Sequence, residues 1–417
     1  MTYIEFFDKT AAENICTCLT YTPDRVIYIG DNSNVMKRHI AHYARVFADR
    51  GCNIEFIYKT VSKSNLDNAV EVLSGIVERY DDCVFDITGG EEILNLALGV
   101  VYAKYPEKKL QIHRINLRNN VVYDCDKDGT TVYQNTPTLS IEENVRIYGG
   151  DIVYGSIEED NTYKWNFTPD FLRDISLIWN VCRGDVRYWN TQIGILEGAE
   201  KVGTVSGLTT VVSKNALEGY LSRHNAKYKK ASGIVTYLLR NGLLTAFDDT
   251  DEAKLVISYK NEQVKKCLTK AGQALEMKVY AIARGILDAD GQPVYNDALN
   301  GVVIDWDGVL HDEKVDDVYD TDNEIDVLLM HDMVPVFISC KNGIIRSEEL
   351  YKLSTVAERF GGPYAKKVLI ATSLQYLGEA GEYLRQRAKD MNIKVIEDVQ
   401  DMDDAELAKK LKNLWCN

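Results

Sequence analysis

The sequence predicts an α/β protein with two or three domains. Its 417 residues exceed the length that one hydrophobic core usually organises. Over roughly the first 125 residues, short apolar runs typical of buried strands alternate with segments whose apolar side chains recur at helical spacing. A second alternation, which includes a β-hairpin, fills roughly the last 155 residues. Such alternation predicts mostly parallel sheets that are covered by helices on both faces.

The first alternation also predicts where a ligand binds. Strands are expected at 25–30, 53–58, 83–87 and 110–115, and helices at 36–47, 66–77 and 91–105. Sheets of this kind bind ligands at the carboxyl ends of their strands. Two glycine-containing turns, 30–34 and 88–91, occupy those ends.

Both turns have features that suit a phosphate-bearing ligand. Glycine lets the backbone approach a ligand closely, and a helix N-terminus attracts anions. The chain contains neither G-x-G-x-x-G nor G-x-x-x-x-G-K-[ST], which disfavours a nicotinamide or P-loop nucleotide site. Each turn taken alone is also compatible with a simple βα connection.

The middle of the chain has a different pattern. Residues 148–205 are rich in aromatic side chains, and we expect them to connect domains by packing between them or in a subunit interface. Block 206–261 predicts helices at 208–224 and 231–240, then strands at 243–247 and 254–259. This order is typical of a winged helix, which either binds DNA through its second helix or serves as a spacer. The apolar composition of 234–239 favours the core.

The last domain, 262–417, contains a polar hairpin. Strands are expected at 301–305, 325–329, 334–340, 367–372 and 393–396. Since successive side chains of a strand alternate between its faces, Glu324 shares a side with Asp326, and Ser339 with Lys341. Carboxylates before one strand and a lysine at the end of the next suit a Mg²⁺ or Mn²⁺ site for phosphodiester cleavage. An ordinary polar hairpin is the alternative.

Composition narrows the classes of function. A formal charge of −15 argues against a general nucleic-acid coat protein, although it does not exclude a nuclease. Nine scattered cysteines predict a reducing compartment, and the absence of a second cysteine pair beside Cys16 and Cys18 disfavours structural zinc. The chain has no apolar run of about 20 residues. We expect a cytoplasmic protein that does not bind membranes.

The two turns resemble a known sensor domain. A strand ending in Gly30-Asp31-Asn32-Ser33 and a later strand running into Asp86-Ile87-Thr88-Gly89-Gly90 resemble the CRISPR-associated Rossmann-fold (CARF) domain, which binds cyclic oligoadenylates across a homodimer axis. The resemblance implies a CARF-like domain at 1–147 and a homodimer. It also implies a ligand site formed by Asp31, Asn32, Ser33, Asn34, Thr88, Gly89, Gly90 and Glu91, with Asn95 one helical turn further on.

The last domain resembles the PD-(D/E)XK restriction-endonuclease-like core. The likeness rests on a helix with Gly272-x-x-Leu275-Glu276, the hairpin with Asp326, and the strand ending at Lys341. It implies Glu276, Asp326 and Lys341 as catalytic residues, with Glu276 and Asp326 binding the metal. This chain departs from the pattern at Ser339, where the family has an acid. Two substitutes are expected as metal ligands, namely Glu324, which we also count as catalytic, and the carbonyl of Cys340.

Together these features resemble the CRISPR ancillary nucleases of type III antiviral systems. The resemblance implies activation by cyclic tetra-adenylate and Mn²⁺- or Mg²⁺-dependent cleavage of DNA, RNA or both. One alternative is a ligand-responsive DNA-binding regulator with a vestigial nuclease site. Another is a haloacid-dehalogenase-like phosphatase, because 302–310 resembles the first motif of that family, with Asp305 as nucleophile. That fold requires more parallel strands than the chain offers after the hairpin.

Overall fold

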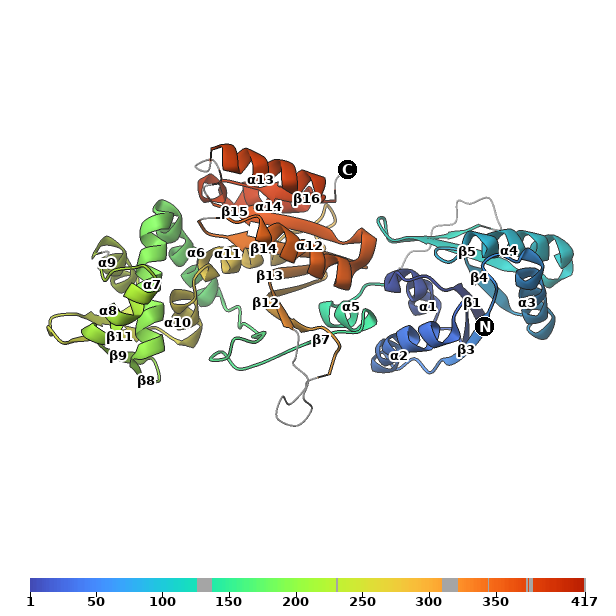
Figure 1. Ribbon diagram of the computed structural model, residues 1–417, viewed down its shortest axis with the longest axis horizontal. Coiled ribbons are helices and arrows are strands. Elements are labelled where there is room, and N and C mark those ends of the chain that lie inside the picture. The colour runs from blue at the N-terminus through green and yellow to red at the C-terminus, as the bar shows by residue number, and fades with distance from the viewer. Residues whose placement is uncertain are drawn as a thin grey trace.

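Figure 1 shows the computed structural model as three lobes in a row. The structure describes residues 1–125, 137–229, 232–309, 322–343, 345–372, 374 and 378–415. The N-terminal part of the chain (blue) forms a lobe at one end, the C-terminal part (orange and red) forms the central lobe, and the middle of the chain (green) forms the lobe at the other end. The chain therefore runs past the central lobe to form the green lobe, and then returns to form most of the central lobe.

The N-terminal lobe is a mostly parallel sheet with strand order β3-β2-β1-β4-β5-β6. Only the pair β5 and β6 is antiparallel among its described strands. The elements are β1 (Thr2–Phe6), α1 (Cys16–Tyr21), β2 (Arg25–Gly30), α2 (Ser33–Asp49), β3 (Glu55–Thr60), α3 (Leu66–Arg79), β4 (Cys83–Asp86), α4 (Glu92–Lys104), β5 (Gln111–Asn116) and β6 (Val121–Asp124). The four strands and three helices expected from the sequence are confirmed to within about three residues.

Strands β1 and β6 are absent from the sequence prediction, and β1 is the central strand of the sheet. All five of its residues are buried, including Glu5. Strand order reverses between β1 and β4, because β2 and β3 extend the sheet in one direction and β4 and β5 in the other. Ligands of open α/β sheets bind outside the carboxyl ends of the strands at such a point. The fold therefore adds the loop after β1 to the two turns that the sequence indicated.

The central lobe has a mixed sheet with strand order β16-β15-β14-β13-β12-β7. Strands β13 and β14 form the predicted antiparallel hairpin, and β14, β15 and β16 run parallel. The elements are β7 (Asp151–Ile152), α11 (Gln273–Arg284), β12 (Asp297–Asp305), β13 (Asp322–His331), β14 (Val334–Lys341), α12 (Glu348–Gly361), β15 (Lys366–Ala371), α13 (Glu379–Asp390), β16 (Ile393–Ile396) and α14 (Asp404–Lys412).

Helices α11 and α12 cover opposite faces of the hairpin. Val327 and Ile338 pack in the same apolar core as Leu275 of α11. Leu328 belongs instead to the core that contains Leu353 of α12. This sandwich places the two helices on either side of the polar residues at the end of the hairpin.

The lobe built from the middle of the chain (green in Figure 1) corrects one expectation and adds detail to another. Segment 148–205 contains two long helices, α6 (Pro169–Gly184) and α7 (Val186–Val202), whose Trp179 and Trp189 are buried. The helix expected at 208–224 is wrong in its first part, because Thr209–Ser213 is strand β9 and pairs with both β8 (Thr204–Ser206) and β11. The remaining elements are α8 (Lys214–Arg223), α9 (Ser232–Arg240), β10 (Leu244–Asp248), β11 (Lys254–Tyr259) and α10 (Glu262–Thr269), which follow the expected winged-helix order.

The N-terminal and central lobes are packed directly against each other. Helix α5 (Ile141–Ile147) lies between them, and the side chain of Asn144 donates a hydrogen bond to the carbonyl of Phe360 at 2.7 Å. The hydroxyl of Tyr364 donates to a carboxylate oxygen of Glu13 at 2.6 Å. One apolar core continues from the N-terminal sheet to α12. Side-chain contacts therefore connect the two lobes without a break.

Two further expectations from the sequence are a reducing compartment and the absence of membrane binding. The eight cysteines inside the described ranges form no disulfide bond with one another. Of the helices that the structure describes, none has the length and the apolar composition needed to cross a bilayer.

Candidate functional site

The end of the hairpin collects hydrogen-bond donors on one carboxylate oxygen. Asp326 Oδ2 accepts the backbone N–H of Cys340 at 2.6 Å and the hydroxyl of Ser339 at 3.2 Å. The ammonium of Lys341 lies 3.4 Å from the same oxygen. The antiparallel pairing of β13 and β14 brings these residues together, as the alternation of side chains predicted.

Glu276 on α11 is a buried acid next to this cluster. Its side chain is 5% exposed, and Oε2 has no hydrogen-bond partner among the described residues. Burial, and then the negative charge of Asp326, raise the pKa of Glu276 well above its ordinary value. Burial also raises the pKa of Asp326, although Lys341 and the Cys340 amide oppose this shift. Two carboxyl groups that disfavour each other's charge are a site where a cation gains affinity.

Lys341 is held as a cation between two acids. Its ammonium lies 3.4 Å from Asp326 and 3.1 Å from Glu349. Burial lowers the pKa of Lys341, but the charges of the two acids outweigh burial and raise it. The side chain of Lys341 is therefore a cation in this arrangement.

Glu324 lines the same pocket as Asp326 and Lys341, but its carboxylate contacts a different partner. Its carboxylate forms an ion pair with Lys270. Burial lowers the pKa of Lys270, and the charges of Glu276 and Glu324 raise it above its ordinary value. The structure thus brings the expected site residues, three acids and one lysine, into one region. Glu324 is ion-paired with Lys270, which the sequence analysis did not include in the site.

A pocket of about 360 Å³ opens over the hairpin. It is lined by residues of β13, β14 and α12, namely Asn323, Glu324, Ile325, Asp326, Ile338, Ser339, Lys341, Glu349, Lys352, Leu353 and Val356. Glu349 and Lys352 were missed by the sequence analysis, because nothing local to α12 shows which strand it covers. No group of three or more His, Cys, Asp or Glu side chains within the described ranges is arranged to hold a metal ion.

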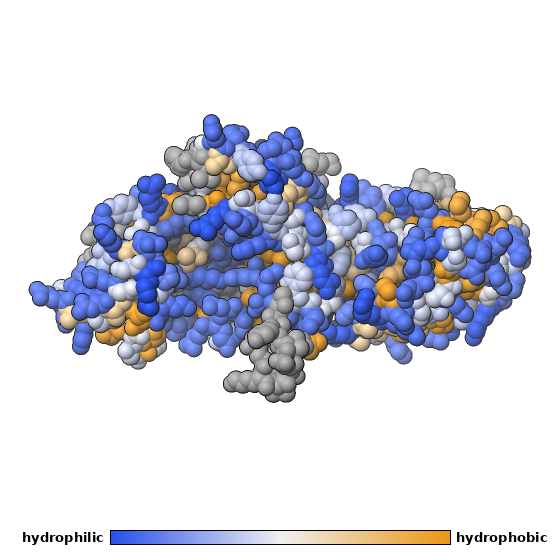
Figure 2. Space-filling view, viewed as in Figure 1, coloured by the Kyte–Doolittle hydropathy of each residue, from blue (hydrophilic) through white to orange (hydrophobic). Residues whose placement is uncertain are grey.

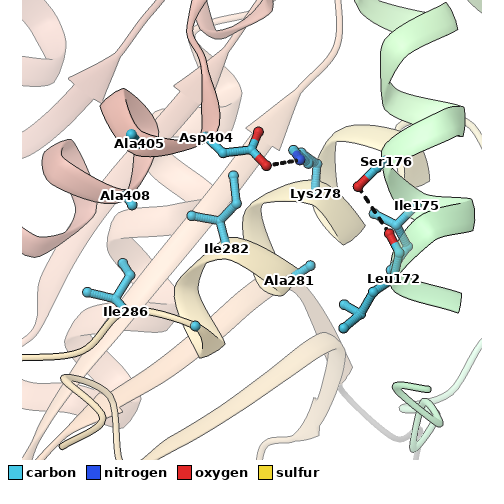
Figure 3. A pocket seen from close by; sticks show the side chains of 11 residues that line it. Leu172, Ile175, Ser176, Lys278, Ala281, Ile282, Ile286, Asp404, Ala405 and Ala408 are labelled. Carbon is cyan, nitrogen blue, oxygen red and sulfur yellow. Dashed lines mark hydrogen bonds and ion pairs between the residues drawn. The ribbon is translucent and has the colours of Figure 1, made fainter. Parts of the chain in front are cut away.

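The second cavity of similar size has no comparable chemistry. It measures about 370 Å³ and lies between α6, α11 and α14, as Figure 3 shows. Its walls are mainly apolar, and Lys278 spans them to donate to Asp404 at 2.7 Å. One ion pair on an apolar wall indicates helix packing, so the hairpin remains the candidate catalytic site.

The phosphatase alternative does not fit the central sheet. Asp305 is buried at the end of β12, and β12 pairs antiparallel with both β13 and β7. The strand that would carry the nucleophile of a haloacid-dehalogenase-like fold therefore lacks parallel neighbours.

The N-terminal lobe joins the two predicted turns. Lys63, which follows β3, lies 3.2 Å from Asp31 and 2.7 Å from Glu91, so its ammonium links both turns. The side chain of Asn32 accepts the N–H groups of Asn34 and Val35 and so caps α2, whose first residue is Ser33. Asn95 is exposed in the first turns of α4.

The turn at 88–91 requires its glycines. Gly90 has φ +89°, and a Cβ there would lie 2.4 Å from Cβ of Phe6. A Cβ on Gly89 would lie 2.9 Å from Cβ of Asp8 in the loop after β1. The turn therefore packs directly on the end of β1, a neighbour that the sequence analysis did not include. Glu91 makes no side-chain cap for α4, so the N–H groups of Glu92 and Ile93 have no capping acceptor in the described structure, whereas that of Leu94 donates to the Glu91 carbonyl at 2.9 Å.

Two buried acids, Asp86 and Glu5, lie next to the turn at 88–91, and Asp86 is hydrogen-bonded to it. Asp86 Oδ1 accepts the N–H of Thr88 at 2.7 Å, and the hydroxyl of Thr17 lies within hydrogen-bonding distance of both Asp86 and Glu5. Burial raises the pKa of Asp86 to about 6. Burial and the charge of Asp86 raise the pKa of Glu5 well above its ordinary value. The turn that faces the expected ligand is thus anchored to a carboxyl pair that is costly to ionise.

Comparison with known proteins gives structural relatives only. No protein-family model and no curated protein matches the sequence. Protein VC1899 from Vibrio cholerae has a similar structure with a TM-score of 0.73, 15% identity, and coverage of 100% of this chain and 98% of that chain. Can2 from Sulfobacillus thermosulfidooxidans, solved in complex with cyclic tetra-adenylate, has a TM-score of 0.65 at 17% identity over 100% and 99%. Both relatives cover 100% of this chain, so the predicted α/β fold class and the resemblance to their architecture are confirmed over its full length.

Proposed function

We propose, from the fold shared with Can2, that this protein is a nuclease of type III CRISPR antiviral defence that cyclic tetra-adenylate activates. The observation that carries the proposal is the hairpin site, where Asp326, Lys341 and the buried Glu276 meet beside a pocket of about 360 Å³. The proposed organisation keeps the limits expected from the sequence, with a sensor at 1–147, a connector at 148–205, a winged helix at 206–261 and a nuclease at 262–417. The proposed compartment is the cytoplasm.

The proposed activator site is the edge of the N-terminal sheet. Can2 was solved with cyclic tetra-adenylate, which supports the same ligand class here. Phosphates of the ligand would meet the N–H groups at the start of α4 and the ammonium of Lys63. The turns at 31–34 and 88–91, with Asn95, would surround it. Asn32 would act through the backbone that it caps, since its side-chain oxygen is occupied.

No three acids among the described residues are already arranged around a metal ion, so Mg²⁺ or Mn²⁺ would have to draw the hairpin acids together on binding. The unpartnered oxygen of Glu276 and the mutual repulsion between Glu276 and Asp326 are the features that a divalent cation relieves. Glu276, Asp326 and the Cys340 carbonyl would hold the ion, joined by Glu324 when it leaves Lys270. When bound, such an ion polarises a phosphoryl oxygen and lowers the pKa of its water. Lys341 would hold the scissile phosphate by charge.

Homodimer formation is supported by an apolar helix face in the sensor. On α4, Leu96 is 65% exposed and Val100 is 46% exposed, one helical turn apart. Figure 2 shows apolar surface gathered on the N-terminal lobe. A second copy of the chain would cover this face and place two ligand turns opposite each other. Activation would then follow if the ligand prefers the dimer arrangement that is competent for cleavage.

Two substitutions test the nuclease site. Asp326→Asn and Lys341→Met are expected to lower ligand-stimulated cleavage of plasmid or single-stranded RNA by at least ~100-fold, because both charges lie at the proposed reacting phosphate. Asp322→Asn is a matched control, since Asp322 is an exposed acid on the same strand. Cyclic tetra-adenylate binding by all three variants should be unchanged. Parent-rate cleavage by Asp326→Asn would remove the site assignment.

A further inference from the structure

Two tyrosines on separate helices of the central lobe are unusually exposed. Tyr351 on α12 is 47% exposed, and Tyr383 on α13 is 61% exposed. Of the phenylalanine, tyrosine and tryptophan side chains that the structure describes, these two have the largest exposed fractions. Aromatic side chains carry a large apolar surface, which core packing normally removes from water. Core packing therefore does not explain why these two rings are aromatic.

One arginine joins the two rings. The guanidinium of Arg387 donates to the hydroxyl of Tyr383 at 2.5 Å and also to the hydroxyl of Tyr351. We call these three side chains the tyrosine platform. Arg385, on the same helix, pairs with Glu397 at 2.7 Å, whereas within the described ranges Arg387 forms no ion pair with a carboxylate. The platform therefore keeps a positive charge in a chain whose formal charge is −15.

The tyrosine platform and the hairpin pocket border the same end of α12. Tyr351 directly precedes Lys352 and is two residues from Glu349, and both of these line the pocket. Glu349 Oε2 lies 3.1 Å from the ammonium of Lys341 at the end of β14. Lys352 is 75% exposed and adds a second cation beside the rings. A negatively charged polymer that enters the pocket thus meets cations and aromatic rings as it leaves.

Single-stranded nucleic acid has the chemistry that fits these groups. Nucleobases stack on exposed tyrosine rings, and a guanidinium binds the phosphate between them. Stacking requires a base with a free face, which the paired bases inside a duplex do not offer. We propose that the tyrosine platform binds single-stranded DNA or RNA next to the hairpin pocket and favours it over duplex. This inference rests on the proposed nuclease function and adds the class of substrate.

Binding of oligonucleotides tests the platform without cleavage. Full-length protein is titrated into fluorescently labelled single-stranded DNA, single-stranded RNA and duplex DNA, with EDTA and cyclic tetra-adenylate present, and anisotropy gives each dissociation constant. Tyr383→Leu should weaken binding of the preferred single strand at least ~5-fold, because it removes the more exposed ring. Tyr383→Phe should bind like the parent, because it keeps the ring and loses only the hydroxyl. Both variants should bind duplex DNA as the parent does.

A second tyrosine beside a cation gives the matched control. Tyr188 on α7 is 45% exposed, and the ammonium of Lys229 lies 5.6 Å from the centre of its ring. Because Tyr188 belongs to the lobe built from the middle of the chain, Tyr188→Leu should keep the parent affinity for single strands. Arg387→Gln should weaken single-strand binding and reduce its dependence on salt, because one phosphate contact is lost.

The outcomes separate the platform from the proposed nuclease. Unchanged single-strand affinity in Tyr383→Leu would overturn the platform, and so would an equal loss for duplex DNA, which indicates a structural role for the ring. Loss of binding in Tyr188→Leu alone would also overturn it. Ring-dependent binding by a parent protein that cleaves nothing with Mn²⁺ would keep the platform and remove the nuclease. Cleavage by the parent without ring-dependent binding would do the reverse.

Discussion

Replacing Asp86 by Asn should change how the stability of the sensor lobe depends on pH. Asp86 is 1% exposed and accepts hydrogen bonds from the N–H of Thr88 and the hydroxyl of Thr17. Asparagine keeps the shape of the side chain and an acceptor for Thr88, but it cannot ionise. The comparison therefore isolates the cost of a buried negative charge that lies close to Glu5.

The sign and size follow from the raised pKa of Asp86. The ordinary pKa of an aspartate is about 3.9, and burial raises that of Asp86 to about 6. Below pH ~4 both folded and unfolded states are protonated, so the charge has no effect. Between pH ~4 and ~6 the folded state alone keeps the proton, and each pH unit lowers the free energy of unfolding by about 1.4 kcal/mol. Above pH ~6 the loss is complete, at about 3 kcal/mol.

Native-state hydrogen exchange of β1 and β4 amides measures this free energy in the intact protein. After correction for intrinsic exchange, the stability of the parent relative to Asp86→Asn should fall by about 3 kcal/mol between pH 4 and pH 7. Peptides of α13, in the central lobe, should show no such difference and serve as an internal control. A pH-independent difference between the two proteins would refute the buried-charge reasoning.

The remaining predictions concern the ligand turn, the dimer and the metal. Gly90→Ala should weaken cyclic tetra-adenylate binding at least ~10-fold by calorimetry, because its φ of +89° and the contact with Phe6 exclude a Cβ, whereas Gly75→Ala on α3 meets no atom within 4 Å and should leave binding unchanged. Leu96→Asp should shift the sedimentation coefficient toward the monomer, and the equally apolar Leu287→Asp in the central lobe should not. Chelation of divalent ions should abolish cleavage without releasing the activator, as filter binding would show.

The hairpin site was predictable because it is formed by residues that lie close together in the sequence. Alternation along two adjacent strands is enough to place Asp326 and Lys341 on neighbouring positions, and the structure confirms their contact. Glu349 was not predictable, since only the packing of α12 across the hairpin brings its carboxylate to Lys341. Lys63 was missed for the same reason, because it reaches Asp31 and Glu91 only after the parallel sheet has aligned three loops.

The errors in the predicted fold also have physical causes. Strand β1 is a five-residue run with Glu5 at its fourth position. A charged residue usually indicates an exposed segment, but pairing with β2 and β4 buries this strand in the centre of the sheet. Thr209–Ser213 was expected to be helical, but its threonines and valines favour a strand once β8 and β11 are there to pair with. In both segments, contacts distant in sequence decided the outcome.

The most direct test is cleavage by the purified protein with and without its proposed activator. Plasmid and single-stranded RNA are incubated with Mn²⁺, in the presence and absence of cyclic tetra-adenylate, and the initial cleavage rates are compared. We predict cleavage of at least one substrate that requires both the metal and the activator. Sequence-specific, metal-independent DNA binding without cleavage of either substrate would contradict the account and favour a regulator.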